Sequence, residues 1–286
     1  QENIDRMHRL AKVRTGETYT CTLNSFMRFR QGKDVLWKDF DADLTASYEA
    51  YLKSTGVSMN TISFYNRILR AVYNRAVEKG FTKQVFPFKN VYTGVEKTIR
   101  RGLPIKTIRN IRNLDLSHCP SLDYARDMFL FSFYTRGMSF VDMAYLKKND
   151  LKNGILTSRR KKTGQRLCIR WERDMQDILE KYHISQESPY LLPIIHKTGK
   201  EERKQYNNAL HLVNKKLKFI GSILQLSIPL TMYVARHSWA TVAKSKNIPL
   251  SVISEGMGHD SENTTLIHLA SLNTEIIDKA NKLILD

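Results

Sequence analysis

The sequence predicts a mainly α-helical protein of two domains, with one small antiparallel sheet in the second domain. At roughly 150 residues per domain, 286 residues correspond to about two domains, and 42% hydrophobic content is enough for sizeable cores. Apolar residues recur at helical spacing along most of the chain and alternate with a period of two only around residues 155–169. We therefore expect a helical domain over 1–93, a basic linker over 94–103 and a mostly helical domain over 104–286.

Three helices are expected in the first domain. Apolar residues at helical spacing predict one over residues 18–29. Asp43 is expected to cap a second, short helix, because its carboxylate can accept hydrogen bonds from first-turn N–H groups. The strongest pattern begins at Asn60 and ends near Gly80, a residue typical of the position just after a helix. The polar face of that long helix is basic and includes Arg67, Arg70 and Arg75.

The second domain follows a segment where the periodicity fades and Gly94, Gly102 and Pro104 interrupt the chain. A buried helix is expected over 123–133 and another over 141–146. Two short strands, 155–158 and 166–169, flank the turn sequence KTGQ at 162–165 and predict a β-hairpin. Further helices are predicted around residues 174–182, 206–220, 231–245, 250–256, 261–270 and 274–284.

Basic residues exceed acidic ones in both predicted domains. The chain has 46 Lys and Arg against 28 Asp and Glu, a net charge of +18. The basic and acidic counts are 18 and 10 up to residue 103, and 28 and 18 after it. This balance favours a polyanionic partner over a role in solubility alone. Residues 151–171 hold seven basic side chains and no acidic one, for which a phosphate backbone is the natural counter-charge. The predicted phosphate contacts are Arg159, Arg160 and Lys161 in the hairpin, and Arg67, Arg70 and Arg75 in the long helix.

Several classes of protein are excluded. No apolar run approaches the roughly 20 residues of a membrane span. The sequence has no CxxC or HxxxH pair for zinc and no GxxxxGK[ST] phosphate loop, so we expect no metal or nucleotide cofactor. Three widely separated cysteines fit reduced thiols in the cytoplasm. The opening residues lack an initiator methionine and a signal peptide, and we expect a fragment whose true start lies upstream.

Two blocks near the C-terminus carry the chemistry. The block YVARHSWAT at 233–241 places an Arg-His pair in an apolar helix, and Gly258-His259 follows at a helix end. Position 268, nine residues after His259, comes shortly after a pair of threonines. These blocks resemble the catalytic domain of the tyrosine recombinases, the phage-integrase family. The first 95 or so residues resemble the family's helical, SAM-like core-binding domain, and similar members include integrases of mobile elements such as conjugative transposons.

The resemblance implies DNA strand exchange without metal or ATP. In this family a tyrosine attacks the scissile phosphate, forms a 3′-phosphotyrosyl link, and is displaced by the 5′-hydroxyl of a partner strand. By match, Arg236 is the second catalytic arginine and His259 the histidine that hydrogen-bonds the phosphate. Lys162 matches the lysine that donates a proton to the leaving 5′-oxygen, with Lys161 as the alternative if the hairpin register differs by one residue.

Three positions depart from the family pattern. Tyr233 replaces a histidine three residues before Arg236. Ser139 stands where the first arginine usually precedes an acidic residue, here Asp142. Arg136, one helical turn earlier, either substitutes for that arginine or is only a helix-end charge. The nucleophile position holds His268, and no tyrosine follows Tyr233.

The missing tyrosine leaves several functions open. We expect impaired strand cleavage, and the alternatives are a histidine nucleophile or a tyrosine from elsewhere in the chain. A non-catalytic, architectural DNA-binding protein is the second hypothesis, and a relaxing topoisomerase is the third. The apolar segment 273–285 either packs within its own chain or, as the resemblance implies, is exchanged between protomers. Exchange would give a homotetramer on double-stranded DNA, from a protein that is monomeric when free and associated with the nucleoid.

Overall fold

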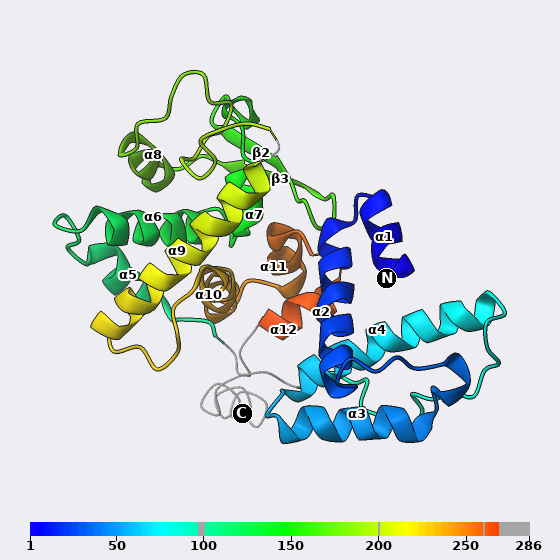
Figure 1. Cartoon of the computed structure of the whole chain (residues 1–286). Coiled ribbons are helices and arrows are strands. Elements are labelled where there is room, and N and C mark those ends of the chain that lie inside the picture. The colour runs from blue at the N-terminus through cyan, green and yellow to red at the C-terminus, as the bar shows by residue number, and fades with distance from the viewer. Residues whose placement is uncertain (97–100, 200, 260, 269–286) are drawn as a thin grey trace, which may run out of the picture. The chain divides into compact units, whose positions relative to one another are not determined.

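The protein is mainly α-helical with one small antiparallel sheet, which confirms the predicted fold class (Figure 1). The computed structural model describes residues 1–96, 101–199, 201–259 and 261–268. The chain divides into two compact units, residues 1–98 and 99–286, with the division inside the segment expected as a linker. The helix predicted over 274–284 lies outside the described residues.

The first unit is built from helices α1 (Glu2–Arg9), α2 (Val13–Phe29), α3 (Ala42–Ser54) and α4 (Met59–Glu78). The helix α1 was not predicted. The carboxylate of Asp41 accepts a hydrogen bond of 2.8 Å from Leu44 N at the start of α3. The predicted cap at Asp43 was therefore wrong, because Asp43 lies inside the first turn. After α4 the chain turns at Gly80 with φ of 76°, a conformation that glycine adopts at little cost.

Aromatic side chains form the core of the first unit. Tyr48 and Tyr73 are fully buried, and their neighbours include Phe26 and Phe40 at ring distances of 5.2 to 5.8 Å. The Tyr48 hydroxyl donates to Ser25 Oγ at 2.7 Å, so the buried phenol keeps a partner. Burial raises the pKa of Tyr48 to about 12. The core thus joins α2, α3 and α4 into one helical body.

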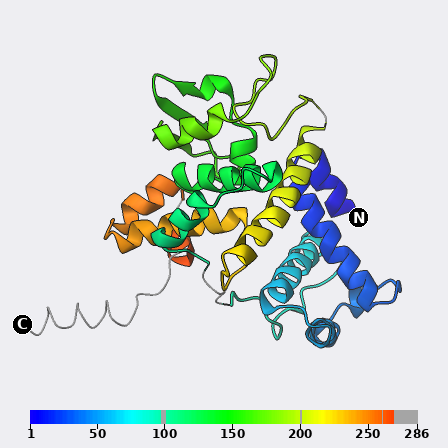
Figure 2. The same ribbon diagram turned by 90° about the vertical axis from the view of Figure 1, so that its left-hand side faces the viewer.

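The second unit is organised around helix α6 (Pro120–Tyr134), whose residues 127–133 are all buried. It packs against α9 (Glu202–Ile223), α10 (Met232–Ser245) and α8 (Arg173–Glu180). In Figure 2 the strands lie at the upper end of this unit, with the orange helices at the level of α6 and below it. The remaining helices described are α5 (Ile105–Asn113), α7 (Phe140–Ala144), α11 (Leu250–Met257) and α12 (Glu262–His268).

The sheet consists of β1 (Leu151–Lys152), β2 (Ile155–Arg159) and β3 (Arg166–Arg170), antiparallel and in that order. Strands β2 and β3 form the predicted hairpin, with Leu156 opposite Ile169, whereas β1 was not predicted. Both of these apolar side chains are buried, so one face of the hairpin packs on the core. The connecting turn is closed by Arg160 N donating to Gln165 O at 2.9 Å and Gly164 N to Arg160 O at 2.8 Å.

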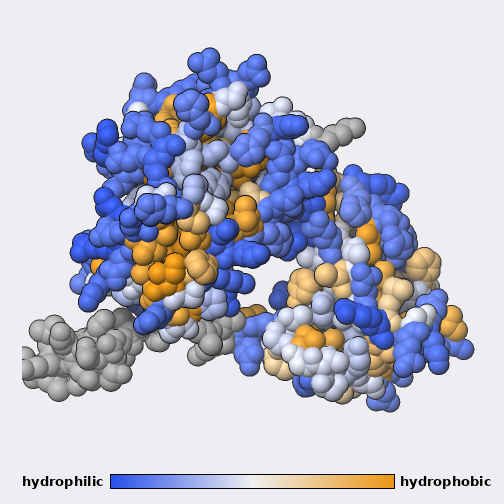
Figure 3. Space-filling view, turned by 60° about the vertical axis from the view of Figure 1, so that its left-hand side comes forward, coloured by the Kyte–Doolittle hydropathy of each residue, from blue (hydrophilic) through white to orange (hydrophobic). Residues whose placement is uncertain are grey.

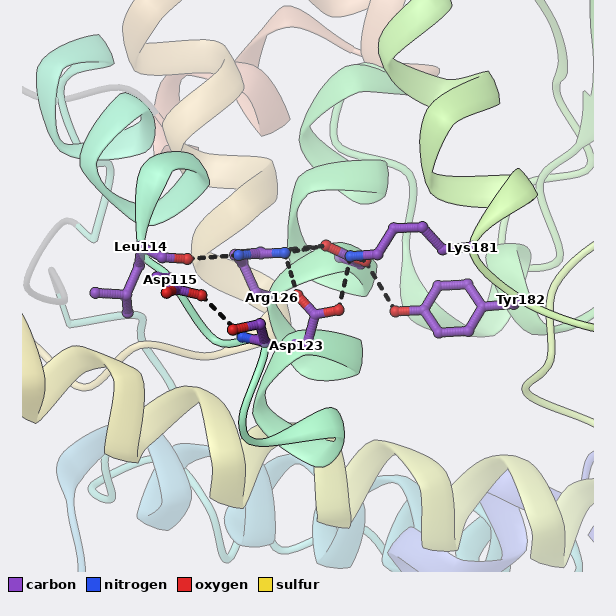
Figure 4. Close-up of polar contacts among 8 residues, drawn as sticks. Leu114, Asp115, Asp123, Arg126, Lys181 and Tyr182 are labelled. Carbon is purple, nitrogen blue, oxygen red and sulfur yellow. Dashed lines mark hydrogen bonds and ion pairs between the residues drawn. The ribbon is translucent and has the colours of Figure 1, made fainter.

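A cluster of charges around the buried Asp127 lies between α6 and the residues that follow α8 (Figure 4). Asp127 is 2% exposed and accepts hydrogen bonds from the Tyr182 hydroxyl at 2.8 Å and from the Lys181 ammonium. Arg126 reaches Asp127 Oδ1 at 3.1 Å, Asp123, and the carbonyl of Leu114 at 2.6 Å. Two carboxylates therefore face two cations, and the cluster joins α6 to Lys181 and Tyr182 across the core.

The surface is polar. Hydrophilic residues cover most of the face shown in Figure 3, with apolar residues gathered in separate patches. Within the part of the chain that the structure describes, we find no helix that combines the length and the apolar character needed to cross a membrane.

Candidate active site

A cavity of about 550 Å³ opens in the second unit, where five elements meet. It is lined by the turn before α7, the β2–β3 turn, helix α9, the first turns of α10 and the segment from His259 into α12. Basic side chains and one histidine converge on it: Arg160, Lys162, Arg236 and His259. Residues nearly 100 positions apart in the sequence thus face one space.

Arg236 lies at the centre of the cluster and is only 5% exposed. Its Nη1 donates to Gly137 O at 2.7 Å and its Nη2 to Met257 O, also at 2.7 Å. These two carbonyls fix the plane of the guanidinium between the turn before α7 and the end of α11. Burial and the nearby charge of Arg160 lower the pKa of Arg236 to about 10, so the group still carries its charge at neutral pH.

His259 follows the left-handed residue Gly258 that ends α11, and it is 8% exposed. Its Nε2 lies 2.7 Å from Arg236 Nη2, and its Nδ1 lies 2.8 Å from Thr265 Oγ1. Burial, followed by the charges of Arg236, Arg160 and Lys162, lowers the pKa of His259 to about 4. The ring is therefore neutral at physiological pH.

Arg160 comes from the β2–β3 turn and is 8% exposed. Its Nη1 donates to the carbonyl of Gly258, directly before His259. Its Nε is buried and has no hydrogen-bond partner among the described residues, and the nearest carboxylate oxygen, Asp142 Oδ2, is 3.9 Å away. A buried donor without an acceptor costs free energy, and Arg160 lines the cavity, so an anion bound there would offer this N–H an acceptor.

The expected arginine substitute, Arg136, occupies a different place. Arg136 and Ser139 were expected one helical turn apart, but both lie between α6 and α7, where Arg136 has a left-handed φ of 61°. The Arg136 side chain runs beside α11, where its Cδ would lie 3.8 Å from a Cβ added to Gly256. Ser139 does line the cavity, and its hydroxyl donates to Asp142 Oδ2 at 2.6 Å. The cation near Ser139 is therefore Arg160.

The two adjacent lysines of the turn face different surroundings. Lys162 lines the cavity. The Lys161 ammonium instead lies 3.0 Å above the ring of Tyr145, while its backbone N–H donates to Asp142 Oδ1 at 2.9 Å. Burial lowers the pKa of Lys161. Of the two alternatives for the cavity lysine, the geometry favours Lys162.

Tyr233 lines the cavity from the first turn of α10 and is half exposed. Its ring meets that of His237 edge-on at 4.6 Å, and burial raises the pKa of the phenol. His237 itself is buried on α10. Tyr233 therefore presents a protonated hydroxyl, able to donate a hydrogen bond at neutral pH.

Two glycines allow the close packing of the cluster. Gly258 has φ of 65°, and a Cβ on it would lie 2.7 Å from Arg160 Cδ. Gly137 has φ of 73°, and a Cβ on it would lie 2.8 Å from Arg236 Cα. Both positions thus need glycine for the backbone conformation and for the approach of an arginine.

The remaining predicted phosphate contacts are not among the described residues that line the cavity. Arg159 is exposed at the end of β2, and its Nη1 donates to Gly164 O at 3.3 Å. Arg67 and Arg70 are exposed on α4, whereas Arg75 donates to Asn3 Oδ1 at 2.6 Å and so contacts α1. His268 is the last residue of α12, and its side chain lies outside the described part of the structure.

The chain is similar to phage integrases and tyrosine recombinases. The family model of the Phage integrase SAM-like domain matches residues 1–91. The tyrosine recombinase XerA of Pyrococcus furiosus is 25% identical over 242 residues, covering 82% of this chain and 79% of XerA. The chain is therefore similar to tyrosine recombinases in its first unit and over most of its length. This similarity supports the resemblance drawn from the sequence blocks.

Solved structures of tyrosine recombinases share the fold. A XerH site-specific recombinase bound to a palindromic difH substrate, in a post-cleavage complex, aligns with a TM-score of 0.72 at 16% identity, covering 99% of this chain and 85% of XerH. A lambda integrase tetramer bound to a Holliday junction aligns with a TM-score of 0.67 at 16% identity, covering 93% of this chain and 76% of the integrase. The likeness in fold extends over both units of the chain.

The buried position of Arg160 was not predicted from the sequence. Arg160 was expected among the outer phosphate contacts, yet its guanidinium is buried between Gly258 and Asp142 at the cavity. The density of basic residues in the hairpin was the available signal. It did not distinguish an inward from an outward side chain, since the turn is irregular.

Proposed function

We propose that this protein binds double-stranded DNA at specific sites with the machinery of a DNA breaking and rejoining recombinase, as the integrase of a mobile element acting in the cytoplasm at the nucleoid, and that His268 impairs its cleavage step. One observation carries most of the weight: Arg160, Lys162, Arg236 and His259 converge on one cavity from separate segments. Three cations and one neutral histidine in a space of about 550 Å³ suit a phosphodiester flanked by parts of its sugars. The similarity to phage integrases and tyrosine recombinases supports the same conclusion.

In this proposal the cations stabilise charge that builds up on the non-bridging oxygens during phosphoryl transfer. Two backbone carbonyls accept hydrogen bonds from Nη1 and Nη2 of Arg236 and fix its guanidinium, and the remaining N–H groups donate to the phosphate. Arg160 supplies the second guanidinium, the one that Ser139 does not provide, through its unpartnered Nε. Lys162 gives a proton to the leaving 5′-oxygen. With Arg160 in this role, Arg136, whose side chain runs beside α11, is not needed as the substitute cation.

This chain departs from the recombinase pattern at the residue that attacks the phosphate, which is His268 instead of a tyrosine. With a tyrosine, a phenolic O–P bond forms as the P–O5′ bond breaks, and the 5′-oxygen takes the proton of Lys162. With His268 the new bond would be P–N, from a shorter side chain. We propose that this chain binds and positions DNA but cleaves it poorly, and that His268→Tyr restores cleavage.

A nicked suicide substrate tests the proposal, because loss of the short product strand traps the covalent intermediate. We expect little adduct with the parent chain and a covalent DNA adduct with His268→Tyr. The double variant His268→Tyr/Arg236→Ala is the matched control and should form none. Abundant adduct with the parent chain, mapped to His268, would contradict the impaired-cleavage proposal.

The second candidate function is an architectural DNA-binding protein derived from an integrase. The histidine at position 268 favours it. The same assay separates the two, because DNA binding without any adduct from His268→Tyr would establish the architectural role. Gel shifts across a salt series measure that binding, since the dependence of affinity on salt reports the number of phosphates contacted.

We further propose that the protein is monomeric when free and forms a homotetramer on DNA by exchanging its apolar segment 273–285. The lambda integrase tetramer on a Holliday junction supports this assembly by analogy of fold. Mass measurement with and without Holliday-junction DNA tests it, and Ile277→Asp should reduce the tetramer without abolishing binding of a single protomer.

A further inference from the structure

Thr265 of α12 makes a contact with the site that the reaction outlined above does not use. It is fully buried, and its Oγ1 lies 2.8 Å from Nδ1 of His259. On the other side of the imidazole, Nε2 lies 2.7 Å from Nη2 of Arg236. His259 is thus held at both ring nitrogens, once by a cation and once by a hydroxyl.

The chemistry of the two partners assigns the proton on the ring. A guanidinium has donors and no acceptor, so Nε2 of His259 must accept from Arg236. A neutral imidazole that accepts at Nε2 carries its proton at Nδ1. That N–H then donates to Thr265 Oγ1. In this arrangement His259 is therefore the Nδ1–H tautomer.

This tautomer is the wrong one for a phosphate ligand. Phosphodiester oxygens only accept hydrogen bonds, so a neutral His259 facing one must present Nε2–H and leave Nδ1 as an acceptor. A hydroxyl can satisfy Nδ1 in both states, because it accepts from Nδ1–H and, after rotation about Cβ–Oγ1, donates to a bare Nδ1.

We propose that Thr265 is a positioning residue that allows His259 to exchange tautomers when a phosphodiester enters the cavity. The ring loses the proton at Nδ1 and gains one at Nε2, with cavity water as the carrier, so its charge does not change. Arg236 is released from Nε2 and turns its N–H to the phosphate. This inference rests on the proposed phosphodiester site and extends it.

The same hydrogen bond joins the histidine to the helix that ends at the nucleophile position. Thr265 and His268 are three residues apart on α12, about one helical turn. The helix also packs against α10, which carries Arg236, and against α11. Loss of the Thr265 hydroxyl should therefore disturb the tautomer of His259 and the placement of residue 268 together.

Nitrogen-15 NMR of the imidazoles measures the tautomer directly in the full chain. The signals of His259 are assigned among the eight histidines by comparison with His259→Asn. We expect a hydrogen-bonded Nδ1–H in the free parent chain and in Thr265→Ser. Duplex DNA should move the proton to Nε2 in both, whereas Thr265→Val should lose the slow-exchanging Nδ1–H and fail to make the shift.

Strand cleavage provides the second readout, in the His268→Tyr background. Adding Thr265→Val should lower the cleavage rate about tenfold, a size typical of removing the partner that orients a functional histidine. Thr265→Ser should restore the rate. Thr241→Val is the matched control, since Thr241 Oγ1 is buried without a hydrogen-bond partner among the described residues and its loss should change neither readout.

The outcomes separate this inference from the proposed function. An Nε2–H tautomer in the free parent chain, or parental spectra and cleavage in Thr265→Val, would overturn the role of Thr265. If His268→Tyr binds DNA without cleaving it, the cleavage proposal fails, and the NMR shift on DNA alone decides whether Thr265 acts as inferred.

Discussion

The second unit contains two clusters of charge, each around a buried side chain, that differ in their balance. Around Asp127, two carboxylates face two cations and a tyrosine hydroxyl at hydrogen-bond distance. Around Arg236, three cations gather, and among the described residues the carboxylate paired with them is that of Asp142, 3.9 Å from Arg160. The first cluster cancels its own charge and joins helices. The second keeps an excess of positive charge beside a cavity, which suits a site that must wait for an anion.

The largest effect is expected from removing a carboxylate of the balanced cluster. Asp127→Ala leaves two cations without their buried partner and should lower the free energy of unfolding by about 3 kcal/mol. Urea denaturation followed by circular dichroism measures this change. The exposed Asp115→Ala should cost under about 0.5 kcal/mol. A loss for Asp127→Ala no larger than that of Asp115→Ala would contradict the structural role of the cluster.

The unbalanced cluster should make stability depend on pH. His259 has a pKa of about 4 in the folded chain, because of burial and three neighbouring cations, against 6.5 ordinarily. Between these values the unfolded chain binds the proton and the folded chain does not, so stability falls as pH decreases from 6.5 to 4. The expected loss is on the order of 3 kcal/mol. Denaturation at several pH values should show a shallower slope in this window for His259→Gln; equal slopes would count against the buried neutral histidine.

An intermediate effect is expected at the glycine between the two arginines. Gly258→Ala forces a Cβ into a left-handed backbone and against Arg160 Cδ, so it should cost about 1 to 2 kcal/mol. It should also weaken DNA binding, because Arg160 must move. Gly154 also has a positive φ, but an added Cβ would meet nothing within 4 Å. Gly154→Ala therefore measures the cost of the backbone conformation without any displacement of Arg160. Equal DNA affinities for the two variants would show that Arg160 does not need Gly258.

The smallest effect on stability is expected where function should suffer most. Arg160→Met removes one of several like charges and leaves an apolar chain of similar length, so the free energy of unfolding should stay within about 1 kcal/mol of the parent or rise. In the His268→Tyr background, covalent adduct formation should fall at least 100-fold. Arg173→Met, on the exposed surface of α8, serves as control. Destabilisation as large as that of Asp127→Ala would place Arg160 in a structural cluster instead.

The fold was largely predictable because its elements depend on local patterns. The alternation at 155–169 predicted the hairpin, and the stripe after Asn60 predicted α4. The cap of α3 was misplaced by two residues, since Asp41 and Asp43 are chemically equivalent and only the backbone geometry selects Asp41. Helix α1 was missed because it is short and strongly polar.

The site residues that stand in a sequence motif were predictable, whereas those placed by contacts between distant parts of the chain were not. Arg236 and His259 stand in recognisable blocks, and both line the cavity. The position of Arg160 depends on Asp142 and Gly258, which lie 18 residues before it and 98 after it, so no spacing rule indicates it. The case for Arg136 assumed a helix through Ser139, whereas the chain turns there.

The hydrogen bond between Asp142 and the backbone of the β2–β3 turn restricts how this turn can change in length. One carboxylate oxygen of Asp142 accepts a hydrogen bond from the backbone N–H of Lys161 and the other accepts one from the Ser139 hydroxyl. The turn is thus fixed at Lys161, between Arg160 and Lys162, which both line the cavity. Deleting the single residue Lys161 would bring Lys162 to the position that Asp142 anchors and leave no lysine at the position that now faces the cavity. The length of this turn is therefore a constraint in itself.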